Sequence, residues 1–427
     1  MSSYSTPSRR RFIGGAAALA AAPMFVPQSA FGANDKVQFG CIGLNSMGNA
    51  DMKHFLRNKE SRVVAVCDVD SNVLTKRQGE VNKHYKDTAC TAYKDFREVM
   101  SRPEIDAVLI GTPDHWHGII AMTAIKAGKD VYCEKPITHT FAEGLALYHE
   151  ANARKTIWQT GSWQRSQLNF RLGAELVRNG VIGKLKHVEV GLPTGKKDPP
   201  APDFKDPPSN IDYDFWIGPS TMAPYDPNRL HWSWRWWLNI GGGQLMDWIG
   251  HHNDIAHWGM DQDYGGPVEA QATGFEFHED TRVWNAPINY EVKCRYASGA
   301  TTSISNKHPM GTKWIGEDGW VYVNRGGRFQ ASNPDWTKND FLKTLNTRLY
   351  ESRNHWDNFV EGVKTRKPCV TTTEISHRSI VPGHLGMVSQ TLGGRKLNFD
   401  PAKQQIVGDD EAQKLLMTFN PRGSWKL

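Results

Sequence analysis

The feature that most constrains the fold is a regular alternation of short apolar runs with helical stretches between residues 37 and 161. The apolar runs lie at 37–43, 63–69, 106–112, 129–136 and 156–161, and the helical stretches between them include 92–100 (AYKDFREVM) and 142–153 (AEGLALYHEANA). Strands that are apolar throughout and separated by helices are typical of parallel sheets covered on both faces. The sequence therefore predicts an α/β fold with a doubly wound parallel sheet, whose ligand binds at the carboxyl edge of the strands.

The turn after the first apolar run, GLNSMG (43–48), has the spacing of a dinucleotide-binding turn. Gly43 and Gly48 occupy the first and last glycine positions of the G-x-G-x-x-G pattern, and Asn45 takes the middle one. Asparagine tolerates a left-handed backbone better than most residues. We expect Ser46 and Met47, at the start of the following helix, to bind a pyrophosphate together with the turn. A plain tight turn is the alternative.

Asp68 ends the second apolar run, 20 residues after Gly48, where a carboxylate accepts hydrogen bonds from the adenosine ribose. The alternative is a helix-capping aspartate, a role that Asp70 could fill. No basic residue follows until Lys76 and Arg77, so the pattern favours NAD over NADP. Other candidate cofactor contacts at the same sheet edge are Thr112, Pro113, His117, Glu134 and Lys135.

The second half of the chain changes character after Pro267. Alternating runs at 267–277, 288–297, 300–306 and 320–324 predict a largely antiparallel open sheet, with a Ser298-Gly299 turn between the second and third runs. The segments 352–363 and 374–390 are predicted to be closing helices. We therefore expect a Rossmann domain over residues 36–160 and an α+β domain over 161–427.

A helix is predicted after the glycines of GGGQLMDWIGHHNDIAHW (241–258), with Asp247, His251, Asp254 and Trp258 on one stripe. A carboxylate one turn from an imidazole can orient the ring, and such a histidine can take a hydroxyl proton. We expect His251 to be the acid/base and Asp247 its partner. A structural polar stripe, or a metal site built from Asp247, His251 and Asp254, is the alternative.

Lys135 lies where the reacting end of the cofactor is expected, and its cation would stabilise a developing alkoxide. It could also be a solvated loop residue. HWSWRWW (231–237) supplies four tryptophans and an arginine, which suit a sugar ring and its hydroxyls, although tryptophans more often fill cores. The candidate substrate contacts are Trp163, Arg165, Arg235 and Trp236.

These residues together resemble the Gfo/Idh/MocA family, named for glucose–fructose oxidoreductase, inositol dehydrogenase and rhizopine catabolism protein. The resemblance rests on GLNSMG, Asp68, TPDHWH, EKP and GGGQLMDWIGHH, and extends from about Val37 to Asp400. It implies a nicotinamide cofactor in the first domain and a sugar or cyclitol against the open sheet. It also implies that Lys135 lies beside the reacting carbon, and that one sheet face forms a homodimer or homotetramer.

The first 33 residues read as a twin-arginine export signal. SRRRFIGG (8–15) is followed by a weakly apolar stretch too short to span a bilayer, and Ala30-Phe31-Gly32 offers a cleavage site. This predicts a periplasmic protein exported in folded form by the twin-arginine machinery, carrying its cofactor with it. Cys41, Cys67 and Cys133 fall inside predicted strands, so we expect mostly free thiols.

Charge and hydropathy exclude several other classes. Three of the six excess positive charges lie in the leader, and the remaining +3 is too little to indicate nucleic acid as a partner. No later segment is long and apolar enough for a membrane span.

Three functions remain open. The first is an oxidoreductase with tightly bound NAD that acts on a CH–OH group of a sugar, glycoside or cyclitol. The second is a redox-neutral glycosidase or epimerase that uses transient oxidation, and the third is a non-catalytic sugar-binding protein.

Overall fold

The computed structural model describes residues 36–427, and the predicted export signal lies outside the described residues. The first sheet is fully parallel, with strand order β3-β2-β1-β4-β5-β6. Its strands are β1 (Val37–Ile42), β2 (Ser61–Cys67), β3 (Thr91–Tyr93), β4 (Ala107–Ile110), β5 (Asp130–Cys133) and β6 (Trp158–Thr160). The order reverses between β1 and β4, which creates the crevice where ligands of such sheets bind. The predicted doubly wound sheet is confirmed.

The helices of this domain are α2 (Ser46–Arg57), α3 (Ser71–Tyr85), α4 (Phe96–Met100), α5 (Asp114–Lys126) and α6 (Phe141–Arg154). One local prediction was wrong. The stretch 92–100 is not one helix, because Tyr93 pairs with Cys67 at the sheet edge and Asp95 caps a short helix by accepting from the Arg97 N–H. The connection between β4 and α5 is short, since α5 begins at Asp114.

The second sheet has nine strands in the order β13-β12-β11-β7-β10-β9-β8-β14-β15. Only β10 and β7 pair in parallel, so the prediction of a largely antiparallel sheet is confirmed. The strands are β7 (Leu185–Gly191), β8 (Glu269–Glu276), β9 (Asn289–Arg295), β10 (Thr301–Ser305), β11 (Gly311–Gly316), β12 (Trp320–Asn324), β13 (Arg328–Ala331), β14 (Leu397–Asp400) and β15 (Gln405–Ile406).

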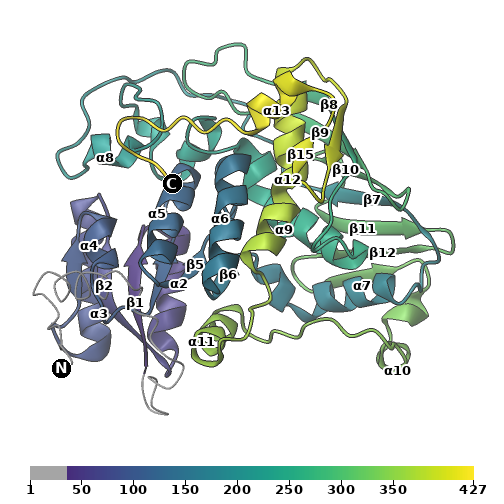
Figure 1. Ribbon diagram of the computed structural model, residues 1–427, viewed down its shortest axis with the longest axis horizontal. Coiled ribbons are helices and arrows are strands. Elements are labelled where there is room, and N and C mark those ends of the chain that lie inside the picture. Colours follow the sequence, from purple (N-terminus) through teal and green to yellow (C-terminus); the bar gives the residue numbers. More distant parts are fainter. Residues whose placement is uncertain (1–35) are drawn as a thin grey trace, which may run out of the picture.

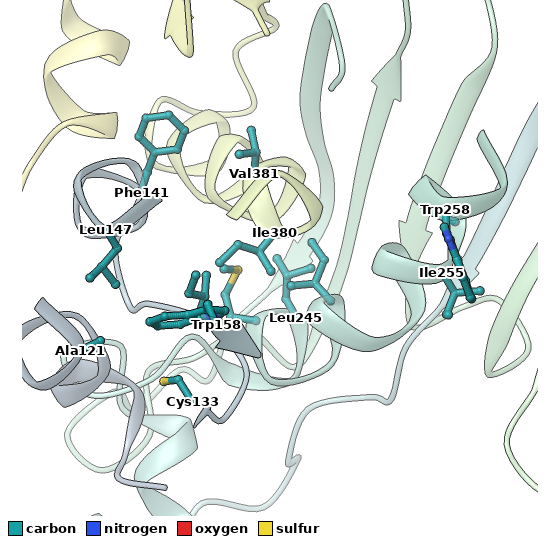
Figure 2. Close-up of a cluster of buried hydrophobic side chains, with 14 of the residues drawn as sticks. Ala121, Cys133, Phe141, Leu147, Trp158, Leu245, Ile255, Trp258, Ile380 and Val381 are labelled. Atoms are coloured by element: carbon teal, nitrogen blue, oxygen red, sulfur yellow. The ribbon is translucent and has the colours of Figure 1, made fainter. Parts of the chain in front are cut away.

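Long helices cover one face of the second sheet and join it to the first domain. They are α7 (Leu168–Arg178), α9 (Gly243–Met260) and α12 (Thr373–Thr391). In Figure 1, α6 of the first domain runs beside α12, and the nine-stranded sheet lies on the other side. Figure 2 shows the apolar core continuing from Phe141 and Leu147 on α6 to Ile380 on α12 and Leu245 on α9. The two domains therefore share one hydrophobic core.

Segments late in the chain return to the first domain. Helix α11 (His355–Thr365) packs on α2 and β1, where Phe359 joins the apolar cluster of Phe39 and Phe55. Trp425 near the C-terminus packs against Trp116. The remaining elements are η2 (Trp163–Ser166), α8 (Tyr213–Ile217), η3 (Pro227–Arg229), η4 (His231–Trp236), η5 (Pro334–Thr337), α10 (Asn339–Lys343) and α13 (Asp410–Leu416). No helix within residues 36–427 is long and apolar enough to cross a membrane.

Candidate active site

The glycine turn between β1 and α2 forms one wall of a cleft at the carboxyl edge of the first sheet. Gly43 has a φ of 75°, and Asn45 is extended with a φ of −97°. Asn45 caps α2, its side chain accepting from the Ser46 N–H, and Ser46 takes the left-handed conformation with a φ of 45°. The expected left-handed role of Asn45 was therefore wrong, because capping the helix requires extended backbone at that position.

Close backbone packing explains the last glycine of the turn. A Cβ on Gly48 would lie 1.9 Å from the Gly43 carbonyl oxygen, and a Cβ on Gly111 would lie 2.5 Å from the Gly48 Cα. The N-terminus of α2 is thereby held against the ends of β1 and β4. This cradle of Gly43, Asn45, Ser46 and Met47 lines the cleft, and the first turn of α2 directs backbone N–H groups toward an anion placed there. Gly48 does not line the cleft, but its close packing against the Gly43 carbonyl oxygen holds the cradle in position.

Asp68 lies on the same cleft directly after β2. Its carboxylate accepts from the Leu44 N–H at 2.8 Å and from the Asp70 N–H at 3.0 Å. Burial raises the pKa of Asp68, and the two backbone hydrogen bonds oppose that rise. Asp70 caps α3, so the alternative that Asp68 is the helix-capping aspartate was wrong. Asp68 therefore ties the glycine turn to the end of β2 and keeps lone pairs for a ribose hydroxyl.

The other predicted cofactor residues divide into two groups. Thr112, Pro113, Glu134 and Lys135 line the cleft. His117 does not, because it lies inside α5 with its two ring nitrogens 2.7 Å from the Pro136 carbonyl oxygen and 2.9 Å from that of Thr112. Burial lowers the pKa of His117 to about 4. The prediction that His117 contacts the cofactor was wrong, since its buried ring lies between the backbone carbonyl oxygens of two loops and does not line the cleft.

Lys135, Asp247 and Arg235 form a buried ion-pair cluster where the cofactor cleft meets a second pocket. The Lys135 Nζ donates to the Asp247 Oδ1 and to the Asp247 backbone oxygen, both at 2.8 Å. The Arg235 Nε donates to the same Oδ1 at 3.1 Å. Burial alone would raise the pKa of Asp247, but the two cations hold that pKa below its usual value. A lysine ammonium has three donors, so one remains for a ligand oxygen.

His251 lines the second pocket one helical turn after Asp247. Its ring lies between the edges of Trp163 and Trp248, at centroid distances of 6.1 Å and 5.6 Å, and its Nδ1 has no hydrogen-bond partner. The expected Asp247–His251 pair is not formed, because the Asp247 carboxylate is taken by Lys135 and Arg235. Burial lowers the pKa of His251 well below its usual value, and the neighbouring cations lower it further. The imidazole is neutral and can accept a proton.

Arg165 and Asp254 belong to the interior. Arg165 is 1% exposed, and its guanidinium makes hydrogen bonds of 2.7 Å and 2.9 Å with Asp254 and of 3.0 Å and 2.7 Å with Asp263. The prediction that Arg165 contacts substrate was wrong, since every direction of its fork is occupied. Asp254 is likewise unavailable for the alternative metal site with Asp247 and His251. Within the described residues, no group of three or more His, Cys, Asp or Glu could hold a metal ion.

The aromatic candidates also divide. Trp163 lines the second pocket, whereas Trp236 is 2% exposed and packs against Trp284 in an apolar cluster, so its predicted substrate contact was wrong. Trp232 from the same tryptophan-rich segment is 54% exposed and lines both pockets. The sequence reasoning also missed Trp248 and Arg325, which line the second pocket beside His251. Trp248 could have been found from its place on the catalytic helix, whereas Arg325 carries no local signal.

Two family models cover almost all of the described chain. The "Oxidoreductase family, NAD-binding Rossmann fold" matches residues 37–162, and the "Oxidoreductase family, C-terminal alpha/beta domain" matches residues 160–427. The chain belongs to the Gfo/Idh/MocA oxidoreductase family. Its first domain is accordingly an NAD-binding Rossmann domain.

Relatives of two kinds occur among the curated proteins. Myo-inositol 2-dehydrogenase from Thermotoga maritima is 29% identical over 375 residues, which cover 82% of this chain and 94% of that protein. Glycosyl hydrolase family 109 protein 2 from Shewanella sp. (strain ANA-3) is 30% identical over 161 residues, and the match spans 36% of this chain and only 35% of that relative's length.

Solved structures share the fold. The WlbA dehydrogenase from Bordetella pertussis, in complex with NADH and UDP-GlcNAcA, has a TM-score of 0.63 at 17% identity and covers 86% of this chain and 99% of its own. The aldose-aldose oxidoreductase from Caulobacter crescentus, complexed with glycerol, has a TM-score of 0.61 at 19% identity, with 85% and 100% covered. At these identities the likeness supports the fold alone.

Proposed function

We propose that this family member oxidises or reduces a CH–OH group of a sugar, glycoside or cyclitol with a tightly bound NAD. The observation that carries the proposal is the placement of Lys135 and Arg235 on both the cofactor cleft and the second pocket, with His251 in that second pocket. A ring carbon bound there would face the reacting end of the cofactor. The length of the match to the Thermotoga myo-inositol 2-dehydrogenase supports the choice of a sugar or cyclitol.

The residues of the cleft fit NAD better than NADP. The Asp68 carboxylate would repel the negative charge of a 2′-phosphate. Arg77 is not free to bind such a phosphate, because it donates to the Leu44 carbonyl oxygen and pairs with Glu80. Lys94 also lines the cleft and could pair with a 2′-phosphate, so the preference for NAD rests on the Asp68 carboxylate rather than on the absence of a cation. The covering segment from Leu230 to Arg235 encloses the cleft and supports slow release of the cofactor.

The roles follow from the charges. Nicotinamide supplies a hydride acceptor or donor when it is bound. Neutral His251 takes the hydroxyl proton as the carbon is oxidised, and the free N–H of Lys135 binds the oxygen and stabilises its developing negative charge. Asp247 keeps the Lys135 ammonium and the Arg235 guanidinium in place, so it acts on the lysine rather than on the histidine.

A redox-neutral glycosidase or epimerase is the second candidate, and a match to proteins named glycosyl hydrolase family 109 favours it. Transient oxidation of a ring hydroxyl acidifies the neighbouring C–H, which allows elimination before the hydride returns. The same Lys135 and His251 serve this route. A non-catalytic sugar-binding protein is the third candidate, and the buried Lys135–Asp247 pair with an unpartnered His251 opposes it.

We also propose that the protein is exported to the periplasm by the twin-arginine machinery after folding around its cofactor, and that it forms a homodimer or homotetramer. The leader sequence supports export. The face of the second sheet opposite α7, α9 and α12 carries partly exposed side chains such as His187, Glu189 and Lys313, and it is the surface that we assign to the oligomer.

The deciding experiment uses the purified protein with whatever cofactor it retains. Released nucleotide is identified by mass spectrometry, and sugars, cyclitols and nitrophenyl glycosides are then added while absorbance at 340 nm and glycoside hydrolysis are recorded. Net reduction of bound NAD supports the oxidoreductase. Hydrolysis without net reduction supports the glycosidase, and binding without either reaction supports the sugar-binding protein.

A further inference from the structure

Arg325 is a cation without an anionic partner inside the second pocket. It follows β12, in the hairpin that leads to β13, and lines the pocket with His251. Its guanidinium lies over the ring of Trp248 at 4.3 Å and over that of Trp163 at 4.5 Å. The Nε and Nη2 atoms are buried without a hydrogen-bond partner, and no ion pair within residues 36–427 includes Arg325. The indole rings fix the guanidinium, but they leave its N–H edge unsatisfied.

The other charges facing this pocket do not neutralise Arg325. The single Asp247 carboxylate already pairs with both Lys135 and Arg235. The second carboxylate, Glu134, lies against the buried Asp51, burial raises the pKa of both, and no ion pair within residues 36–427 joins Glu134 to Arg325. Arg353 at the rim pairs with exposed Glu351. The pocket therefore carries excess positive charge next to the proposed reaction site.

A partly buried guanidinium with unmade hydrogen bonds is costly for the free protein. An anionic group of the ligand would remove that cost by accepting the open N–H bonds. Two indole rings contact the face of the guanidinium, and its Nε and Nη2 atoms are enclosed in the free protein, so the guanidinium must turn toward the pocket to present that edge to a ligand. A planar carboxylate matches the edge with two parallel hydrogen bonds, and the indole side chains of Trp163 and Trp248 line the pocket as apolar surface for the sugar ring that bears it.

We propose that Arg325 binds the carboxylate of the substrate, and that the substrate class is therefore a sugar acid such as a hexuronate or its glycoside. The inference rests on the proposed function for the position of the reacting carbon. With the carboxylate on Arg325, the ring lies across Trp163 and Trp248, and a ring hydroxyl lies toward His251 and Lys135. The carboxylate is recognised and takes no part in the hydride or proton transfer.

The test compares glucuronate, galacturonate and mannuronate, each with its parent hexose, by calorimetric titration of the protein with its cofactor bound. We expect at least one uronate to bind tenfold or more tightly than its hexose. Arg325→Gln should reduce that ratio at least tenfold, and Arg325→Lys, which keeps the charge but loses the fork, should give an intermediate ratio. Arg328→Gln, an exposed position at the start of β13, is the matched control and should leave the ratio unchanged.

Several outcomes would overturn the proposal. They are an unchanged ratio in Arg325→Gln, failure of all three uronates to bind, tighter binding of glucose 6-phosphate than of glucuronate, and loss of NAD from Arg325→Gln. Loss of NAD from Arg325→Gln would show that Arg325 binds the cofactor instead of the substrate. The proposed function has a separate test. Uronate binding without reduction of NAD or hydrolysis would support the carboxylate site and contradict the enzymatic function. Reduction of NAD by hexoses and uronates alike would support the enzymatic function and contradict the carboxylate site.

Discussion

At the scale of single residues, the chemistry depends on which side chains remain unpaired. Asp247 is the most connected carboxylate of the site, whereas His251 has an open Nδ1 and a neutral ring. A base must accept a proton that it does not already hold, and an electrostatic partner must be fixed before the reaction. We therefore propose different roles for these two residues on one helix turn, with Asp247 positioning Lys135 and His251 acting on the substrate.

Asp68 gives the first prediction at this scale. Asp68→Ala should weaken NAD retention, because the carboxylate that accepts the ribose hydroxyls is lost and the Leu44 N–H that it holds is freed. The measurement is the NAD content after dialysis, together with the shift in melting temperature on adding NAD. Asp409→Ala, which removes the cap of distant α13, is the control. Full NAD content in Asp68→Ala would contradict the ribose assignment.

His251 gives the second prediction at the scale of single residues. Burial lowers the pKa of His251 well below its usual 6.5, so the imidazole stays neutral when the pH of the solution falls to 6.5. The rate of sugar oxidation should therefore decline only at a pH below 6.5. His251→Gln should lose about 10²- to 10⁴-fold in rate, as removal of a general base typically does. The measurement is single-turnover reduction of bound NAD across pH, with His84→Gln at the exposed C-terminal end of α3 as control. Reduction at the parental rate in His251→Gln would show that another group accepts the proton.

At the scale of elements, helix α9 organises the molecule more than any other segment. Its N-terminal half carries Asp247 and His251 to the pocket, and its C-terminal half carries Asp254 into a buried ion pair with Arg165 of η2. Ser162 donates to the Gly250 carbonyl oxygen at 2.6 Å, which fixes the segment after β6 against the middle of the helix. One stripe of one helix thus contains a reactive half and a structural half.

Removing Arg165 should therefore test stability rather than catalysis. Arg165→Ala leaves Asp254 buried without its cation, and breaking such a pair costs about 3–5 kcal/mol of unfolding free energy. Urea unfolding is the measurement. Lys343→Ala, which breaks an exposed pair with Asp340, is the control and should cost less than about 1 kcal/mol. A small loss of stability in Arg165→Ala accompanied by a raised KM would return Arg165 to the substrate site.

At the scale of the whole molecule, a continuous core couples the two domains. The cluster that begins at Ile42 and Val108 in the first sheet extends through α6, α12 and α9 to Trp314 in the second. Trp425 near the C-terminus packs against this core, whereas helix α11 returns to the first domain and joins a separate apolar cluster there. A site formed between elements of both domains is held together by this packing.

The thiols give a prediction at this scale. All six cysteines of the chain are free and buried, which agrees with the expectation of mostly free thiols that was based on the strand residues Cys41, Cys67 and Cys133. Burial raises the pKa of these three thiols well above its usual value. Ellman's reagent should react slowly with native protein and with six thiols per chain in denaturant without reductant. Intact disulfides in the denatured, unreduced protein would contradict this and the proposal of folding before export.

The sequence by itself determined the parallel sheet, the glycine turn and the position of Asp68, because these depend on local periodicity and on a fixed spacing along the chain. It also located Lys135, Asp247 and His251 as residues of the site. It did not determine their partners. Asp247 is bound by a lysine 112 positions earlier in the chain, and that pairing follows from docking α9 against the end of β5.

The tertiary structure alone decided which polar and aromatic residues reach the pockets. His117, Arg165 and Trp236 have sequences around them that suit a site, yet each is buried against partners from other elements. Arg325 has no such signal, and it reaches His251 only because β12 and β13 pair at the far edge of the second sheet. The reason is physical: a side chain's chemistry is encoded locally, but its solvation and its partners are set by long-range packing.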